Sequence, residues 1–265
     1  DDYFNISGVK FWYDGSPYTG SMYLNEPFKS SSVNQEKIHV PLGHSGKALW
    51  KNDEISNRIK QYDSVGWQVA VHTQGDRAIS ETLDAFEKSG IPKNSRHRLE
   101  HCLLPSKKDI QRMAKLGVSP SFHINHLWYY GEALEDHIIG RERTDKILPL
   151  KAAENNSLIF SLHADQPMFE SDPLSLLHTA VNRKTRDGKI VGKSNKISVE
   201  QGLKSLTINA AWQIKMENKI GSIKPGKYAD FVILDQNPMM VDPEKIKDIH
   251  VLQTIVNGNI VYKKD

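Results

Sequence analysis

Four short segments of this chain end on residues that can bind a metal ion, and they follow one another along the sequence. Each is a brief apolar or β-rich run, and the four lead to Lys10, His72, His101 and Asp165. Such runs are typical of buried strands, which places the polar residue at the carboxyl end of each strand. Two imidazoles, a carboxylate and a carboxylated lysine amine would suit zinc best, as one ion or two, with iron, manganese or nickel as other divalent candidates.

Each of these four residues also has an ordinary structural interpretation. Lys10 in an apolar strand would be costly as an unpaired charge, so it should either meet a carboxylate or be carboxylated by CO2. His72 could be a ligand or a buried histidine bonded to the backbone. Asp165 could bind a metal and take a proton from its water, or it could simply cap a helix.

Three further side chains, those of His163, His123 and Trp128, are predicted to contact a substrate. His163 stands two residues before Asp165 and therefore points the same way in a strand. His123 and His126 lie near another predicted strand end, and they are interpreted as pocket wall rather than as ligands. The aromatic stretch around Trp128 suggests an apolar group on the substrate.

The segment from His97 to His101 fits a competing motif, H-x-x-E-H, which inverted zinc proteases carry on a helix. Here Pro92 and Pro105 confine the segment, and its apolar residues form no helical stripe. In a strand, alternate residues share a face, so both histidines would lie together while Glu100 points away. The protease hypothesis fails if residues 96–102 form a strand.

Alternating strand and helix patterns predict an α/β core over residues 1–216, and a change to strands predicts a small β unit over residues 217–265. Residues 14–46 are rich in Gly, Ser, Pro and Asn and are predicted to form a long functional loop. Asn257-Gly258 predicts a hairpin. The core strands are expected at residues 6–13, 67–72, 96–102, 118–123 and 158–163, and the main helices at 47–65, 76–88, 106–116, 172–182 and 198–216.

Composition excludes several classes of protein. With 265 residues, 38% hydrophobic and 25% charged, the chain has an ordinary globular composition. The net charge of +3 is spread along the chain, which indicates against nucleic-acid binding. No apolar run is long enough for a membrane helix. Cys102 is the single cysteine, so an internal disulfide is excluded; a cytoplasmic location is the expectation.

Taken together, these motifs resemble the amidohydrolase superfamily and, within it, the YtcJ-like branch that includes N-substituted formamide deformylase. The likeness covers nearly the whole chain. The residues that carry it are Val9-Lys10-Phe11 with Asp14-Gly15-Ser16, His72-Thr73-Gln74-Gly75-Asp76-Arg77-Ala78 with Leu83-Asp84-Ala85-Phe86-Glu87, Arg98-Leu99-Glu100-His101, His163-Ala164-Asp165-Gln166-Pro167, Ala180-Val181-Asn182-Arg183, and the closing stretch from Ile220 to Phe231.

The resemblance implies a metal-bearing (β/α)8 TIM barrel beside a small β-sandwich made from both chain ends. By this analogy Lys10, His72, His101 and Asp165 end the fourth, fifth, sixth and eighth barrel strands and bind the metal. The implied reaction is attack of a metal-bound hydroxide on a non-peptide C–N bond of a small amide-like or formamide-like substrate. Asp165 would accept the water proton and pass it to the leaving amine.

The resemblance also implies two ligands that this chain lacks. The family carries a His-x-His motif on its first strand, and none of the 265 residues forms one. The expectation is a partial barrel, from the fourth strand onward, that binds metal weakly and catalyses poorly. Its apolar surface would need the missing N-terminal half, or self-association, to cover it. The alternative is an inactive binding or regulatory fragment on the same fold.

Overall fold

The structure, a computed structural model that describes residues 6–265, contains a five-stranded parallel sheet in the order β1-β2-β3-β4-β5. Sheet order follows chain order, as expected when each strand returns to its neighbour through a helical connection. The strands are β1 (Gly8–Trp12), β2 (Gln68–Thr73), β3 (Arg98–His101), β4 (Ser119–His123) and β5 (Ser161–His163). All five lie within the ranges predicted from the sequence, apart from one residue at the end of β2.

The strand register aligns the carboxyl ends of neighbouring strands. Trp12 pairs with His72 across β1 and β2, and His123 pairs with His163 across β4 and β5. In a parallel sheet, residues paired in this way point to the same side. Side chains from strands far apart in the sequence therefore meet at one edge of the sheet.

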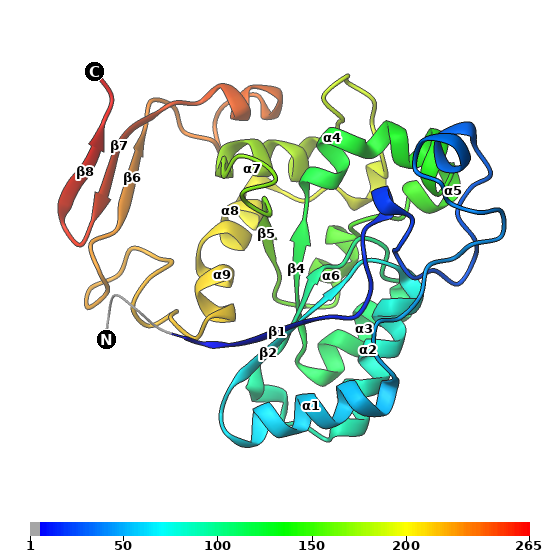
Figure 1. Ribbon diagram of the computed structural model, residues 1–265. Helices are drawn as coiled ribbons and strands as arrows, with labels where there is room; N and C mark the ends of the chain where they lie inside the picture. Colours follow the sequence, from blue (N-terminus) through cyan, green and yellow to red (C-terminus); the bar gives the residue numbers. More distant parts are fainter. Residues whose placement is uncertain (1–5) are drawn as a thin grey trace.

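Helices cover the outer side of this sheet, with α1, α2 and α3 grouped beside β1–β3 (Figure 1). In α2 (Asp76–Ser89), Ala78, Ile79, Leu83 and Phe86 are fully buried, as their helical spacing predicts. The other helices are α1 (Asn52–Ser64), α3 (Lys107–Leu116), α4 (Asn125–Ala133), α5 (Arg141–Thr144), α6 (Leu150–Asn155), α7 (Pro173–Asn182), α8 (Val199–Leu206) and α9 (Ile208–Gln213).

The helix predicted over residues 198–216 is two helices in the structure. Thr207 has φ −126° and ψ −94°, so it leaves the helical conformation and separates α8 from α9. The predicted helix 47–65 also starts late, at Asn52, and the loop 14–46 contains short helical turns at Pro17–Thr19 and Val33–Lys37. The break at Thr207 has a consequence for the site, because it turns α9 so that Gln213 reaches strands β4 and β5.

The C-terminal residues form a second, antiparallel sheet of β6 (Phe231–Leu234), β7 (Val251–Val256) and β8 (Asn259–Lys263). Figure 1 shows it beyond α7–α9, on the side of the molecule away from α1–α3. The predicted hairpin is confirmed, since Asn257 and Gly258 both have positive φ between β7 and β8. The tail is not strands alone, because Pro243–Asp248 forms a 3-10 helix. None of the helices in residues 6–265 has the length and apolarity needed to cross a membrane.

Candidate metal centre

Four histidines from four neighbouring strands meet at the carboxyl end of the five-stranded sheet. The ring of His101 lies 4.4 Å from that of His72 and 5.1 Å from that of His163. The ring of His123 lies 5.1 Å from that of His163 and 4.1 Å from that of His126, which begins the next helix. The strand ends thus bring together residues that span more than ninety positions of the sequence.

Two groups of these side chains have the spacing of metal ligands. One is His101, His163 and Asp165, and the other is His101, His123 and His126; within each group the ligand atoms all lie within 4.8 Å of one another. His101 belongs to both groups. The sequence-based interpretation assigned His163 and His123 to the substrate and His126 to the pocket wall, so the geometry adds three residues that could bind a metal.

His101 reaches this position through its backbone. Simple alternation would turn it to the same side as Leu99, which is fully buried in the core. His101 and Cys102 instead have φ of 75° and 46°, in the left-handed region that non-glycine residues rarely adopt. The chain therefore turns at the strand end, and the imidazole contacts His72 and His163.

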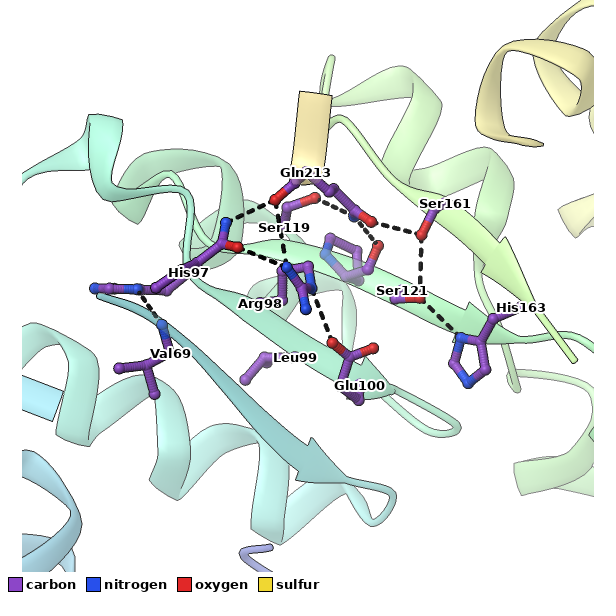
Figure 2. Close-up of polar contacts among 12 residues, drawn as sticks. Val69, His97, Arg98, Leu99, Glu100, Ser119, Ser121, Ser161, His163 and Gln213 are labelled. Carbon is purple, nitrogen blue, oxygen red and sulfur yellow. Dashed lines mark hydrogen bonds and ion pairs between the residues drawn. The ribbon is translucent and has the colours of Figure 1, made fainter. Parts of the chain in front are cut away.

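Strand alternation predicted that Glu100 points away from the site, whereas in the structure it faces the site. It accepts a hydrogen bond of 2.8 Å from Arg98 Nε, and both side chains line the same hollow as His163 (Figure 2). Its negative charge also raises the pKa of Asp165. The prediction was wrong because the twist at His101 lets adjacent residues of β3 contribute to one site.

Lys10 is exposed, so the prediction that it lies buried in its strand was wrong. The reason is that β1 shows one side to solvent, where Trp12 is also 57% exposed. The lysine charge nevertheless acts on the site, because it lowers the pKa of His163 and that of Asp165. An exposed amine carries no desolvation cost, so nothing about burial forces a chemical change on Lys10.

Burial keeps the histidines of the site neutral near pH 7. It lowers the pKa of His72 to about 4 and that of His163 to about 3. The pKa values of His101, His123 and His126 also fall well below the usual range, because burial and the neighbouring imidazoles both oppose a positive charge. A neutral imidazole has a free lone pair, which is the form that binds metal ions.

Asp165 follows β5 with a positive φ of 62°, which turns its carboxylate back toward the strand ends. Partial burial raises the pKa of this carboxyl group, while the charge of Lys10 opposes the rise. A carboxylate with a raised pKa is a stronger proton acceptor than an ordinary one. The structure thus places a proton acceptor beside the histidines.

Asp14 is a buried carboxylate to which the sequence-based interpretation gave no role. It accepts hydrogen bonds of 2.9 Å from the backbone N–H groups of Tyr23, Gln74 and Gly75, and it lies 3.8 Å from His72 Nε2. Burial raises its pKa to about 7. A Cβ on Gly75 would lie 1.9 Å from the carbonyl oxygen of Tyr23, so the turn requires glycine. The Asp14-Gly15 pair directly after a strand was the available signal.

The donor set of the site fits a divalent cation. Both ring nitrogens of His123 and the Nε2 of His126 are buried without a hydrogen-bond partner within residues 6–265. The other nitrogen of His126 lies 2.6 Å from the hydroxyl of Tyr18. Unpartnered polar nitrogens are costly in a core, and a metal ion bound by several imidazoles would take one nitrogen of each ring.

Aromatic rings surround the histidines, although Trp128 is placed elsewhere. The Trp12 ring stacks 5.1 Å from His72, and Phe169 lies 5.4 Å from His123. Trp128 packs edge-on against His178 of α7, with 5.5 Å between the rings. The structure thus offers Trp12 and Phe169 as the apolar side chains that contact the histidines directly.

The inverted-protease motif is excluded by the structure. Residues Arg98–His101 form a strand, so His97 and His101 do not share the face of a helix. His97 lies at the opposite end of β3, where its Nδ1 accepts a hydrogen bond of 2.9 Å from the backbone N–H of Val69. Its Nε2 lies 3.2 Å from Asp63. His97 is therefore a structural histidine.

The fold is similar to that of solved structures described as metal-dependent hydrolases. A solved structure described as an uncharacterized metal-dependent hydrolase from Pyrococcus horikoshii OT3 matches with a TM-score of 0.76 and 26% identity, covering 90% of this chain and 46% of that chain. A second one, from Pyrococcus furiosus, matches with a TM-score of 0.74 and 27% identity, covering 88% and 45%.

The family follows from the sequence match. A family model described as the amidohydrolase family matches residues 1–262, so this chain belongs to the amidohydrolase family. Among curated proteins, YtcJ of Bacillus subtilis (strain 168) is 28% identical over 99% of this chain and 48% of its own length. N-substituted formamide deformylase of Arthrobacter pascens is 26% identical over 92% of this chain and 45% of its own length. The chain spans about half the length of the curated relatives it matches.

Proposed function

We propose that this protein is a metal-dependent hydrolase that cleaves a non-peptide C–N bond in a small amide-like or formamide-like substrate. The observation that carries the proposal is the group of buried histidines at the strand ends, in which His101 and His163 lie at ligand spacing from Asp165. The substrate class is supported by similarity to a relative named for its action on N-substituted formamides.

The ligand set we propose is Lys10, His72, His101 and Asp165, with Lys10 in its carboxylated form and zinc as the metal. Neutral imidazoles and carboxylates are ligands that zinc accepts, with one or two ions bound. A bound zinc ion lowers the pKa of a water molecule to about 7 and polarises a carbonyl oxygen. The protein's own side chains then decide where protons move and how the substrate lies.

Asp165 is the proton carrier in this proposal. Its raised pKa lets it hold the proton taken from the attacking water and give it to the departing amine nitrogen, which completes the cleavage. His163 lies at ligand spacing from Asp165 and His123 stacks against His163, and both histidines are proposed to contact the substrate. The rings of Trp12 and Phe169 would take the apolar substituent that the sequence assigned to Trp128.

We also propose that the five parallel strands are part of a (β/α)8 barrel. The support is the exposure of Lys10 and Trp12 on β1, and a hollow of about 700 Å³ on the sheet that Arg98, Glu100 and His163 line. In a closed barrel, further strands would cover these residues. Either the remaining barrel strands or a second copy of the chain would cover these residues. The mass of the protein in solution distinguishes the two.

The test is a zinc-dependent assay for the release of formate and amine from N-substituted formamides. The expected result is slow, saturable turnover that disappears in Asp165→Asn and persists in His250→Gln. His250 is a suitable control because it is exposed and pairs with Asp235, remote in sequence from the strand ends. Zinc binding with no turnover on any amide would favour the binding-fragment alternative and contradict the proposal.

A further inference from the structure

The loop over residues 14–46 is packed and hydrogen-bonded like the rest of the molecule. Four of its apolar side chains are buried in the main hydrophobic core, namely Met22, Leu24, Phe28 and Val40. Backbone hydrogen bonds join its two halves, from the Leu24 N–H to the Ser45 carbonyl at 2.7 Å and from the Phe28 N–H to the His44 carbonyl at 2.9 Å. A loop that opens easily has few buried apolar contacts, so these contacts indicate a fixed wall rather than a lid.

Two polar side chains fasten this loop to the segment around α5, beside which Figure 1 shows it in blue. The side-chain amide of Asn34, which is 1% exposed, donates a hydrogen bond of 2.8 Å to the His137 carbonyl. Arg143 of α5 donates to the carbonyl oxygens of Glu26 at 3.0 Å and of Pro27 at 2.8 Å. Hydrogen bonds from a charged guanidinium are stronger than neutral ones, so Arg143 holds this part of the loop firmly.

The fastened loop brings Tyr18 to the histidines of the site. The Tyr18 hydroxyl lies 2.6 Å from Nδ1 of His126, and the two rings are 5.5 Å apart. The Tyr18 ring also packs 4.2 Å from the ring of Tyr130 in α4. The Tyr130 ring lies 6.0 Å from that of Phe169, which in turn lies 5.4 Å from His123. The three aromatic rings thus form a row beside the two histidines, contributed by three separate segments of the chain.

Tyr18 stands at the end of this row that is farther from Phe169. An apolar group that starts against Phe169 and follows the row passes Tyr130 and then meets Tyr18. The Tyr18 side chain is partly buried and its hydroxyl is bonded, so the ring cannot turn aside without losing a hydrogen bond. Replacing it by a small residue would leave a cavity beside His126. A ring held in this way limits the length of the group that fits along the row.

We propose that Tyr18 is a specificity-determining residue, carried by a fixed wall over residues 14–46, and that it limits the length of the apolar substituent that the site accepts. Asn34 and Arg143 are positioning residues, since they act through the loop. The specificity role rests on the proposed function and deepens it, whereas the fixed wall does not depend on it. Each methylene group that enters a new apolar cavity should strengthen binding roughly fourfold.

The fixed wall is tested by hydrogen exchange on the whole chain, read by mass spectrometry after peptic digestion. The amides of residues 22–28 and 38–46 should exchange at least about a hundredfold more slowly than those of an unfolded chain. Exchange in both stretches at the rate of an unfolded chain would mean that the loop opens freely, and it would overturn the wall.

The fastening is tested by the same measurement on variants. Arg143→Ala and Asn34→Ala should speed the exchange of residues 24–34 by about tenfold, because each removes a hydrogen bond between the loop and the segment around α5. Arg141→Ala is the matched control and should change nothing, since Arg141 lies on the same helix with a side chain that is 82% exposed and lies 4.0 Å from Asp145. Equal exchange in Arg143→Ala and Arg141→Ala would overturn the positioning role of Arg143.

The specificity role is tested with N-alkylformamides of increasing chain length in the presence of zinc, by formate release and by calorimetric binding. In Tyr18→Ala, kcat/KM and affinity for the longer members should rise roughly fourfold for each added methylene group, through KM rather than kcat. Tyr18→Phe keeps the ring and should stay within about twofold of wild type. Arg143→Ala should relax the length limit in the same direction with kcat unchanged, which a loss of stability alone would not produce.

The possible outcomes separate this proposal from the proposed function. Tyr18→Leu takes the place of Tyr18→Ala if a thermal melt shows that the alanine variant is unfolded. An equal length preference in wild type and variant overturns the specificity role, and so does a variant that neither binds nor cleaves the longer formamides. Binding with the expected length preference but without release of formate contradicts the proposed function alone.

Discussion

Two buried histidines stand at opposite ends of one short strand and have opposite surroundings. His97, before β3, accepts a hydrogen bond from the Val69 backbone and lies 3.2 Å from Asp63. His101, at the end of β3, contacts three other imidazoles and shares its ligand-type spacing with two separate groups. Four residues apart in the sequence, the two histidines make contacts of different kinds.

The difference shows how a structural histidine can be told from a functional one. His97 has a backbone donor at Val69 and the carboxylate of Asp63 nearby, although its Nε2 makes no contact with hydrogen-bond geometry within the described residues, and no other imidazole lies against it. The imidazoles around His101 cannot all donate to one another, and neutral nitrogens remain without partners at His123 and His126. Such a group costs stability unless a cation binds it. The comparison therefore assigns a structural role to His97, at one end of β3, and a role in metal binding to His101, at the other end.

The largest effect is expected for Asp165→Asn, at the carboxyl ends of the strands. The amide cannot carry the proton from water to the leaving amine, so the rate of C–N cleavage should fall by roughly 10²- to 10⁴-fold. The measurement is formate release from an N-substituted formamide at saturating zinc. A variant that retains the wild-type rate would remove Asp165 from the mechanism.

The next largest effect is expected for His101→Ala. Its zinc affinity should fall by about a hundredfold, because one ligand of roughly four carries about 3 kcal/mol of the binding free energy. The free energy of unfolding should change little, since the substitution relieves the crowded imidazoles. Chelator competition and denaturant unfolding measure the two quantities, and a large loss of stability with unchanged zinc affinity would reverse the assignment.

His97→Ala should give the opposite pattern. It leaves the backbone N–H of Val69 and the carboxylate of Asp63 without their buried partner, which should lower the free energy of unfolding by about 1–3 kcal/mol. Zinc affinity should stay within about twofold of wild type. If zinc affinity instead fell as far as in His101→Ala, the two ends of β3 would not differ in the way described.

The last expected effect is a dependence of stability on pH. Burial lowers the pKa of His72 and that of His97 to about 4, from 6.5, so below pH 6.5 the unfolded chain binds protons that the folded chain does not. Stability should therefore be full above about pH 6.5 and fall toward about pH 4. Asp14 opposes this trend, because its pKa is raised to about 7 and its contribution is lost as pH rises. The buried histidines outnumber it, so denaturant unfolding at about pH 7 and about pH 5 should show a net loss at the lower pH, and a gain would contradict the account.

The strand ends could be predicted from the sequence because each apolar run is short and is followed by a polar residue. Periodicity likewise located α2, and the turn signal Asn257-Gly258 located the hairpin. It was harder to predict to which side of a strand each side chain points. Glu100 and His101 both reach the site because the positive φ of His101 interrupts the alternation. Nothing in the local sequence predicts a left-handed backbone conformation at this histidine.

Contacts between residues far apart in the sequence were the hardest to predict. Gln213 reaches β4 and β5 only because the chain breaks at Thr207, inside what the periodicity predicts as one helix. The exposure of Lys10 depends on what covers the open side of β1, which is a matter of assembly rather than of local pattern. The assignment of Lys10, His72, His101 and Asp165 as ligands stays a prediction.

The most direct test of the central claim is equilibrium dialysis of the chain against buffered zinc, followed by counting of bound metal by mass spectrometry. Wild type and His97→Ala should retain zinc at the same free concentration, and His101→Ala should release it. Equal retention by His101→Ala, or no zinc on the wild type at any concentration that leaves the protein folded, would contradict a metal centre at the carboxyl ends of these strands.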